Sequence, residues 1–300
     1  MCRIINGRDI SECIYSEMEK EFRNLAISEQ NFSLRLAVIS VGDDKASKIY
    51  VNCKKKACEK LGIKLEEHIF DSYVAEIEVI NCIKSLNKNG FVAGILVQLP
   101  LPSHFCQENI LSAIDKNKDI DALNPVSLGK LVFPTYNEKK DFAPCTALAI
   151  LEILKYEKIN LLGKHVIVIG KSNIVGKPLA LMLSHKRATV TLCDSKTKNL
   201  PFFCKNADII VSAAGVKNLI NKNMVSNKSI IIDAGIVKND DGKICGDVNF
   251  VEIAPVVRAI TPVPGGVGPV TVAIMIKNLH IAAKNKKAIH GELNSRSAQI

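Results

Sequence analysis

The stretch of sequence that decides the fold is His165-Val-Ile-Val-Ile-Gly170-Lys-Ser-Asn-Ile-Val-Gly176-Lys-Pro178. Its apolar, β-branched beginning predicts a buried strand that ends at Gly170, and a helix-like pattern follows from Pro178 through Leu183. A strand, a glycine-bearing turn and a helix with proline near its first turn are typical of a nucleotide-binding unit. Gly170 would permit the tight turn, and Gly176 would let a phosphate approach the first amides of the helix.

The spacing Gly170-x-Ser-x-x-x-Gly176 departs from the common G-x-G-x-x-G fingerprint, and a plain turn between a strand and a helix also favours glycine. Further strands are expected at residues 189–193, 208–212 and 229–233, which gives a Rossmann-like succession. This context favours a dinucleotide site over a plain turn.

The choice of cofactor depends on the loop after the second of these strands, which reads Cys193-Asp194-Ser-Lys196-Thr-Lys198. An acidic residue at this strand end often holds the ribose 2′-hydroxyl of NAD, so Asp194 favours NAD. Lys171, Lys196 and Lys198 favour NADP instead, because they would bind its 2′-phosphate. NADP is our first choice, and NAD stays open.

The first half of the chain also alternates strands with helices. Apolar runs at residues 34–41, 65–70 and 91–97 predict strands, and segments at residues 47–61 and 76–86 predict helices. Continuous apolar strands separated by amphipathic helices imply a parallel sheet that is covered on both faces. Ligands bind beyond the carboxyl ends of such strands.

Two domains are expected, because the chain has 300 residues, of which 47 % are apolar. The first domain, residues 1–143, is expected to be completed by a C-terminal helix at residues 270–290. The second, residues 144–269, is the Rossmann-like domain. The predicted fold class is α/β, with two parallel sheets and an interdomain cleft, and no apolar run reaches the roughly 18 residues of a membrane span.

Charge and cysteine content limit the class of partner. The net charge is +10, but the lysines are dispersed and tryptophan is absent, which favours anionic metabolites over nucleic acid. The ten cysteines are scattered without a Cys-x-x-Cys pair, which is typical of free thiols in a reducing cytoplasm. With no leader pattern and no metal-ligand spacing, a cytoplasmic protein without a bound metal is expected.

One lysine of the helix expected at residues 47–61 falls on its apolar face. At about 100° per residue, one narrow stripe collects Ser47, Tyr50, Val51, Lys54, Cys58 and Leu61. Partial desolvation of Lys54 would lower its pKa and make it a proton carrier near neutrality. The alternative is a lysine whose stem packs while its ammonium reaches water. Gln98 and Asp121 follow strand ends, so both are expected near Lys54.

Six motifs lie in an order and spacing that are very specific. They are Ser47-x-x-Tyr50-Val51-x-x-Lys54, Gln98-Leu-Pro-Leu-Pro102, Asp119-Ile-Asp121, Pro144-Cys145-Thr146, Gly170-x-Ser172-x-x-Val175-Gly176-x-Pro178 and Thr261-Pro-Val-Pro-Gly-Gly-Val-Gly-Pro-Val-Thr271. On these motifs the chain resembles, over nearly its full length, the bifunctional methylenetetrahydrofolate dehydrogenase/methenyltetrahydrofolate cyclohydrolase family.

The resemblance implies two reactions. The methylene carbon of 5,10-methylenetetrahydrofolate gives a hydride to NADP+, and water then hydrolyses the methenyl product to 10-formyltetrahydrofolate. Lys54 would handle the proton of hydrolysis, and Gln98 would tune its protonation through a hydrogen bond. Tyr50 would pack against the folate ring system, and Asp121 would accept hydrogen bonds from the pterin. Capping of a turn or strand end is the alternative role for Asp121 and Gln98.

The resemblance also implies contacts for each ligand. The expected catalytic residues are Lys54, Tyr50, Gln98 and Asp121. The expected folate contacts are Tyr50, Val51, Pro100, Leu101, Asp121, Gly265, Gly266 and Pro269. The expected cofactor contacts are Gly170, Lys171, Ser172, Val175, Gly176, Ser195, Lys196, Ala214, Gly215 and Ile236. No metal is required, and a homodimer formed through the cofactor domain is implied.

Four segments depart from the family pattern. The usual Asp-Gly-Phe-His stretch reads Asp121-Ala-Leu-Asn124, and the usual Cys-Thr-Pro-x-Gly reads Cys145-Thr-Ala-Leu-Ala149. An arginine that often follows the first glycine is Lys171, and a His-Ser-Arg stretch is Asp194-Ser-Lys196. The last two departures bear on the choice of cofactor, since lysine does not reproduce a bidentate arginine.

Three other functions are weighed against this one. A short-chain dehydrogenase would explain the pair Tyr50-x-x-x-Lys54, but its glycine fingerprint would precede that pair, whereas Gly170 follows it. A non-catalytic protein that uses its charge to bind nucleic acid is the second. The third is a monofunctional, NAD-dependent methylenetetrahydrofolate dehydrogenase that has lost hydrolysis.

Overall fold

The structure is a computed structural model that describes residues 2–27, 34–138, 140–238 and 242–297. The chain divides into two compact units, which are described separately. The small-sheet unit comprises Ile14–Cys145 and Met275–Ile300, and the large-sheet unit comprises Met1–Cys13 and Thr146–Ile274.

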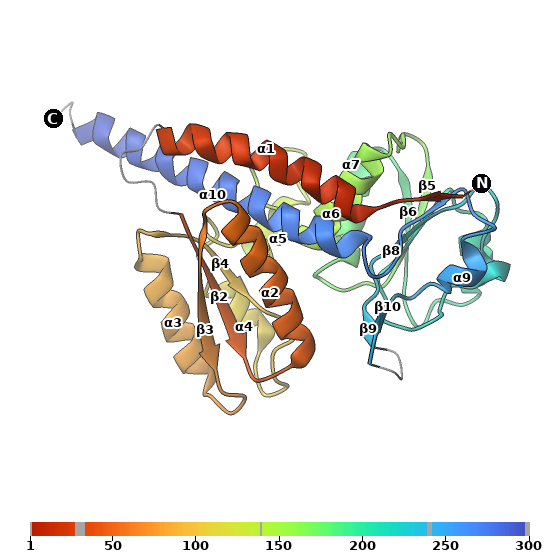
Figure 1. Ribbon diagram of the computed structural model, residues 1–300, viewed down its shortest axis with the longest axis horizontal. Coiled ribbons are helices and arrows are strands. Elements are labelled where there is room, and N and C mark those ends of the chain that lie inside the picture. The colour runs from red at the N-terminus through yellow and green to blue at the C-terminus, as the bar shows by residue number, and fades with distance from the viewer. Residues whose placement is uncertain (1, 28–33, 139, 239–241, 298–300) are drawn as a thin grey trace. The chain divides into compact units, whose positions relative to one another are not determined.

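The small-sheet unit is built on three parallel strands in the order β3-β2-β4. They are β2 (Arg35–Val41), β3 (Lys64–Phe70) and β4 (Val92–Val97), with α2 (Lys45–Lys60) against β3 and α3 (Glu76–Lys88) against β4 (Figure 1). All six side chains of β4 are buried, whereas those of the edge strand β3 are exposed or half-buried. The carboxyl ends of β2 and β4 are therefore firmly placed by the core.

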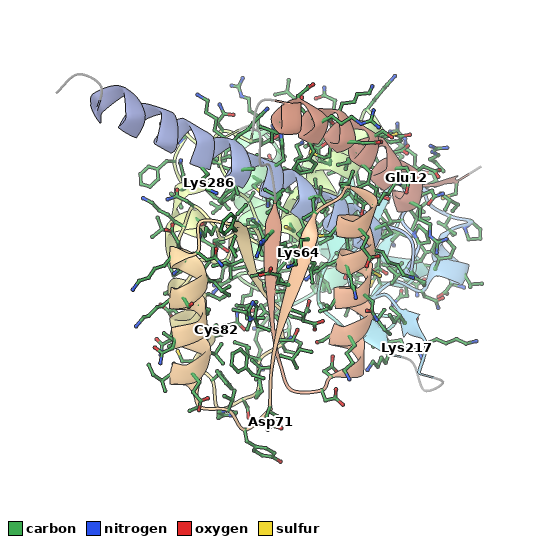
Figure 2. The ribbon with its side chains drawn as sticks, turned by 60° about the vertical axis from the view of Figure 1, so that its left-hand side comes forward. Glu12, Lys64, Asp71, Cys82, Lys217 and Lys286 are labelled. Atoms are coloured by element: carbon green, nitrogen blue, oxygen red, sulfur yellow. The ribbon has the colours of Figure 1, made fainter. Side chains whose placement is uncertain are left out.

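Shorter helices and two long ones complete this unit. Lys64 begins β3, Asp71 follows its end, and Cys82 lies on α3 (Figure 2). Two short helices follow β4, namely α4 (Gln107–Ser112) and α5 (Pro125–Lys130). Two long helices, α1 (Gly7–Ile27) near the N-terminus and α10 (Val267–Ser297) near the C-terminus, each have residues in both units. In this unit α1 packs on α10 through the rings of Phe22 and His280, whose centroids lie 5.3 Å apart. No helix in the described ranges is long and apolar enough to cross a membrane.

The large-sheet unit has six parallel strands in the order β1-β11-β8-β7-β5-β6. They are β1 (Arg3–Ile4), β5 (His165–Ile169), β6 (Thr189–Cys193), β7 (Ile209–Ser212), β8 (Ile230–Asp233) and β11 (Ala259–Ile260). The connections are α6 (Cys145–Tyr156), α7 (Gly176–His185), α8 (Leu200–Lys205), η1 (Lys222–Met224), the hairpin of β9 (Val237–Lys238) and β10 (Ile244–Cys245), and α9 (Phe250–Ile253). β5, β7 and β8 are almost wholly buried, as their continuous apolar sequences predict.

The N-terminal residues lie in a different unit from the one that the sequence suggested. We expected residues 1–143 in one domain, but β1 pairs in parallel with β11 and so extends the large sheet. Gly7 donates its amide to the Gly265 carbonyl at 2.8 Å, and a Cβ at Gly7 would overlap the carbonyl of Gly266. A two-residue strand carries no periodicity, so only its long-range pairing reveals its place. The cleft expected between the two units stays a prediction.

Candidate active site

Helix α2 presents its apolar face to the sheet of the small-sheet unit. The Asp44 carboxylate caps this helix by accepting the Ser47 amide at 2.7 Å, which fixes where the first turn begins. Val51 and Cys58 are buried, whereas Lys55 is exposed. The predicted stripe is therefore present, and Lys54 lies on it with its side chain partly buried.

The ammonium group of Lys54 is held by one side chain and influenced by another. Its Nζ donates a hydrogen bond to the Oε1 of Gln98 at 2.8 Å. Burial lowers the pKa of Lys54, because removal of water disfavours the charged form, while the nearby Asp121 carboxylate acts in the opposite direction. This arrangement sets Lys54 apart from a surface lysine.

Gln98 is oriented by its own backbone neighbours. Its amide donates to the carbonyl of Ile39 on β2 at 2.8 Å, so the residue sits at the carboxyl end of the sheet. Its Nε2 donates to the Leu99 carbonyl at 2.7 Å, which leaves Oε1 directed at Lys54. The following Leu99–Pro100 peptide bond is cis. The alternative role of Gln98, the capping of a strand end, thus accounts for the hydrogen bond of its Nε2 but not for the one that its Oε1 accepts from Lys54.

Asp121 sits on a loop that is fixed from within. The buried Asp119 carboxylate accepts the Asn124 amide at 2.8 Å, and burial raises the pKa of Asp119 to about 6. Ala122 adopts a left-handed φ of 54°, at the position where the family pattern has glycine. Alanine has the smallest Cβ substituent of the chiral residues, so it tolerates this conformation better than a branched residue would.

Two residues that sequence reasoning did not assign to the site support this loop. Asn278 on α10 is fully buried, and its Nδ2 donates to the carbonyls of Ile120 at 2.7 Å and Ala143 at 3.0 Å. The buried Cys145 thiol donates to the Ile120 carbonyl at 3.4 Å and lies beside Asp121. Burial and the Asp121 carboxylate raise the pKa of Cys145 well above its ordinary value, so the thiol stays protonated. The available signals were an asparagine within an apolar helix and the place of Cys145 in the Pro144-Cys145-Thr146 motif.

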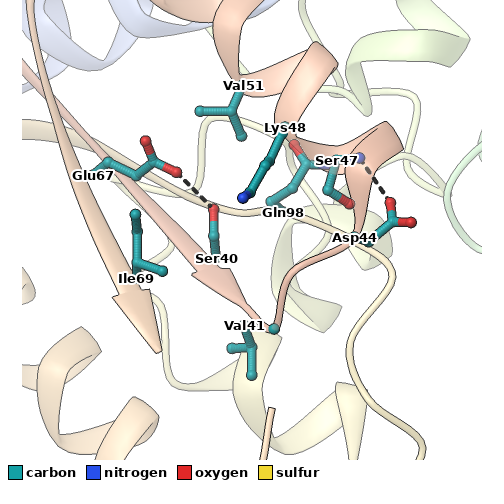
Figure 3. A pocket seen from close by; sticks show the side chains of 10 residues that line it. Ser40, Val41, Asp44, Ser47, Lys48, Val51, Glu67, Ile69 and Gln98 are labelled. Atoms are coloured by element: carbon teal, nitrogen blue, oxygen red, sulfur yellow. Dashed lines mark hydrogen bonds between the residues drawn. The ribbon is translucent and has the colours of Figure 1, made fainter. Parts of the chain in front are cut away.

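A small hollow opens at the carboxyl end of β2 (Figure 3). It is lined by Ser40, Val41, Gly42, Asp44, Ser47, Lys48, Val51, Glu67, Ile69 and Gln98. Val51 and Gln98 belong to the predicted site, but Lys54 and Asp121 do not line the hollow. Of the other expected folate contacts in this unit, Tyr50 and Leu101 are half-buried and Pro100 is exposed.

The glycine turn of the large-sheet unit has the close packing that a phosphate cradle needs. Gly170 has a φ of 108°, and a Cβ there would overlap the Ala213 carbonyl. A Cβ at Gly176 would overlap the carbonyl of Gly170. Ser172 accepts the Val175 amide at 3.2 Å just before α7 begins. The turn and the following helix N-terminus fit a dinucleotide, since bare backbone lies where phosphates would approach.

The loop after β6 carries opposite charges. Lys171 forms an ion pair with Asp194, and this contact lowers the pKa of the Asp194 carboxyl. Asp194 also accepts the Lys196 amide at 2.9 Å, while the side chains of Ser195 and Lys196 are exposed. The acidic residue that favours NAD is therefore partly neutralised, and Lys196 remains available to a phosphate.

The remaining predicted contacts lie at other strand ends of the same unit. Ala214 and Gly215 follow β7, and the exposed Ile236 follows β8. Gly265, with a φ of 107°, and Gly266 precede Pro269 at the start of α10. These folate contacts thus belong to the large-sheet unit, whereas Lys54, Gln98 and Asp121 belong to the small-sheet unit.

Comparison with known proteins gives matches across almost the whole chain. Residues 5–121 match the catalytic domain, and residues 144–287 the NAD(P)-binding domain, of tetrahydrofolate dehydrogenase/cyclohydrolase. The bifunctional protein FolD of Acetivibrio thermocellus is 43 % identical over 282 residues, which cover 94 % of this chain and 97 % of that protein. The corresponding protein of Lysinibacillus sphaericus is 41 % identical, over 95 % of this chain and 98 % of that one.

Solved structures give the same result. The bifunctional FolD enzyme of Campylobacter jejuni has a TM-score of 0.89 at 41 % identity, covering 95 % of this chain and 99 % of that one. The Trypanosoma brucei enzyme, solved with NADP and an inhibitor, has a TM-score of 0.90 at 33 % identity, with 95 % and 98 % covered. The predicted α/β fold class and the predicted dehydrogenase and cyclohydrolase activities are confirmed. The chain belongs to the tetrahydrofolate dehydrogenase/cyclohydrolase family.

Proposed function

We propose that this protein oxidises 5,10-methylenetetrahydrofolate with NADP+ and hydrolyses the methenyl product to 10-formyltetrahydrofolate, with Lys54 as the proton carrier of the second step. The observation that carries this assignment is the partly buried amine of Lys54, which donates to Gln98 at 2.8 Å and has a lowered pKa. A lowered pKa supplies the neutral amine that a general base requires. The bifunctional relatives support hydrolysis over the alternative of a monofunctional dehydrogenase.

Hydrolysis requires the small-sheet unit to accept a proton from water and to hold the substrate beside the acceptor. When water attacks the methenyl carbon, the neutral Lys54 amine accepts the proton that the water loses. The C–N bond to the ring nitrogen then breaks, the hydroxyl proton moves to that nitrogen, and one proton in total passes to solvent. Gln98 keeps the amine in place because its Oε1 accepts from Nζ, and Asp121 would accept hydrogen bonds from the pterin. Tyr50, half-buried one turn before Lys54, would pack against the folate rings.

The large-sheet unit would hold NADP, which accepts the hydride when bound. Gly170, Ser172, Val175 and Gly176 would line the phosphates, and Lys171 and Lys196 would supply positive charge to the 2′-phosphate. The Trypanosoma brucei relative, solved with NADP, supports this choice. We further propose that the protein is cytoplasmic, as its free cysteines suggest. We also propose that it acts on folate derivatives, has no nucleic acid as a partner and forms a homodimer, as the family resemblance suggests.

Steady-state assays with 5,10-methylenetetrahydrofolate and each cofactor test the proposed function. We expect methenyl formation with a higher kcat/KM for NADP+ than for NAD+, followed by decay of the methenyl absorbance. A clear preference for NAD+, or methenyl that accumulates without decay, would contradict the assignment.

Replacement of Asp194 by asparagine should increase the preference for NADP+. The change removes a negative charge beside the expected 2′-phosphate and releases Lys171 from its ion pair. Because exposed ion pairs contribute up to about 1 kcal/mol, the ratio of kcat/KM for NADP+ to that for NAD+ should rise about fivefold. Asp208→Asn is the matched control, since Asp208 pairs with Lys164 and should leave the ratio unchanged.

Replacement of Asp121 by asparagine should move the pH profile of hydrolysis. The Asp121 carboxylate favours the charged form of Lys54 and so raises its pKa. Its removal lowers the pKa of Lys54, so the neutral amine is present at lower pH and the rising limb of cyclohydrolase kcat/KM shifts to lower pH. Asp71→Asn, which alters an exposed carboxylate beyond β3, is the control. A limb that stays in place or moves to higher pH would exclude this coupling.

A further inference from the structure

The large-sheet unit contains a fully buried carboxylate that neither reaction uses. Asp247 is 0 % exposed, and its two oxygens accept three hydrogen bonds. Its Oδ2 accepts from the Ser212 hydroxyl and from the Ala214 amide, both at 2.7 Å, and its Oδ1 accepts from the Val216 amide at 2.8 Å. These donors follow one another along the chain from the last residue of β7. The Asp247 carboxylate therefore fixes the loop at residues 213–216, which directly follows β7.

The position of Asp247 is itself fixed by neighbouring strand ends. The buried Asp233 carboxylate, at the end of β8, accepts the amides of Asp247 at 3.1 Å and Val248 at 2.9 Å. Gly235 packs directly on Asp247, because a Cβ at Gly235 would overlap that carboxylate. The side chain therefore has little room to move away from the loop.

The loop that Asp247 holds is in contact with the glycine turn. The Ala213 amide donates to the Ile169 carbonyl at 2.8 Å, and a Cβ at Gly170 would overlap the Ala213 carbonyl. Gly215 within the loop has a left-handed φ of 68°. Any shift of residues 213–216 would therefore change the backbone that faces the expected cofactor beside Gly170. Charged acceptors form the stronger class of hydrogen bond, which suits an element that must not move.

We propose that Asp247 is a positioning residue for the cofactor: it fixes the loop at residues 213–216 in the conformation that binds NADP. The proposal rests on the assignment of the large-sheet unit as the NADP site. Ser212 and Asp233 act with it, Ser212 as a donor to its carboxylate and Asp233 as the acceptor of its amide.

The test compares the wild-type protein with Asp247→Asn in three measurements. An amide side chain cannot accept on its NH₂ side, so it must leave either the Ala214 amide or the Val216 amide without its acceptor, whereas the Ser212 hydroxyl can turn to accept from the NH₂ group. Calorimetric titration should show a Kd for NADP+ that rises roughly tenfold or more. Hydrogen exchange should accelerate at whichever of the Ala214 and Val216 amides loses its acceptor. Hydrolysis of supplied methenyltetrahydrofolate, which consumes no cofactor, should keep its wild-type kcat/KM and so reports an intact fold.

Asp208→Asn is the matched control, because Asp208 accepts the His165 amide at 3.0 Å at the opposite ends of β5 and β7. It should leave the Kd for NADP+ unchanged. A wild-type Kd in Asp247→Asn, with normal exchange at Ala214 and Val216, would overturn the proposal. If the wild-type protein itself does not bind NADP+, the assignment of the cofactor site is what fails. Should Asp247→Asn not fold, Ser212→Ala removes one donor only and should raise the Kd in the same direction; an unchanged Kd there overturns the proposal.

Discussion

Replacement of Lys54 by methionine is expected to abolish hydrolysis of methenyltetrahydrofolate while oxidation of the methylene substrate continues. A positioned general base contributes about 10²- to 10⁴-fold to a rate, so cyclohydrolase kcat should fall by that range. Hydride transfer needs no proton carrier, so the methenyl product should accumulate. Methionine has a similar length and an apolar side chain, and it suits the partly buried face that Lys54 shares with Val51 and Cys58.

The neighbouring Lys55 provides a matched control for this experiment. Lys55 is exposed on the same helix, one residue away from Lys54. Lys55→Met makes the same side-chain replacement on the same helix, but at an exposed position, so it should leave both activities within about twofold of wild type, as is usual for surface substitutions. Wild-type hydrolysis in Lys54→Met, or an equal loss in both variants, would remove Lys54 from the mechanism.

Replacement of Gly176 by alanine is expected to abolish the dehydrogenase and to spare the cyclohydrolase. The added Cβ would overlap the Gly170 carbonyl, so the turn between β5 and α7 must open. Backbone displaced in this way no longer presents the first amides of α7 to a phosphate. Dehydrogenase kcat/KM with NADP+ should fall at least about 10²-fold, since a misplacement of about 1 Å has that effect on a rate.

Gly129→Ala separates this effect from a general effect of alanine. Gly129 lies on α5, and a Cβ there has no heavy atom within 4 Å. The variant should keep both activities and should be slightly more stable, because alanine favours the helix by up to about 1 kcal/mol. Near-normal NADP+ turnover in Gly176→Ala would show that the turn does not bind the cofactor.

The sequence predicted the parts of the fold that carry a local pattern. Continuous apolar runs identified β2, β4 and β5 to within one residue, because strands buried on both faces have no alternation to misread. The apolar stripe of α2 placed Lys54 on the inner face, since one helix fixes which side chains share a side. The glycine turn was recognisable despite its unusual spacing, because the strand before it and the helix after it were both clear.

The parts that depend on distant contacts could not be predicted. β1 is only two residues long, and it joins the large sheet through pairing with a strand about 250 residues later. Asn278 and Asp247 are single polar residues in ordinary sequence surroundings. Their roles depend on carbonyl and amide groups that only the fold brings to them. The lowered pKa of Lys54 was suggested by the helix, and the nearness of Gln98 by its place at a strand end. The hydrogen bond between them came from the family resemblance.

The most direct test of the central claim is an NMR titration of the Lys54 side chain in protein labelled at the lysine Nζ and Cε atoms. The signal absent from Lys54→Met identifies the residue. We predict that the pKa of Lys54 lies below the ordinary value of a lysine side chain, since burial lowers it. A Lys54 signal that titrates at or above the ordinary value of a lysine side chain would contradict the account.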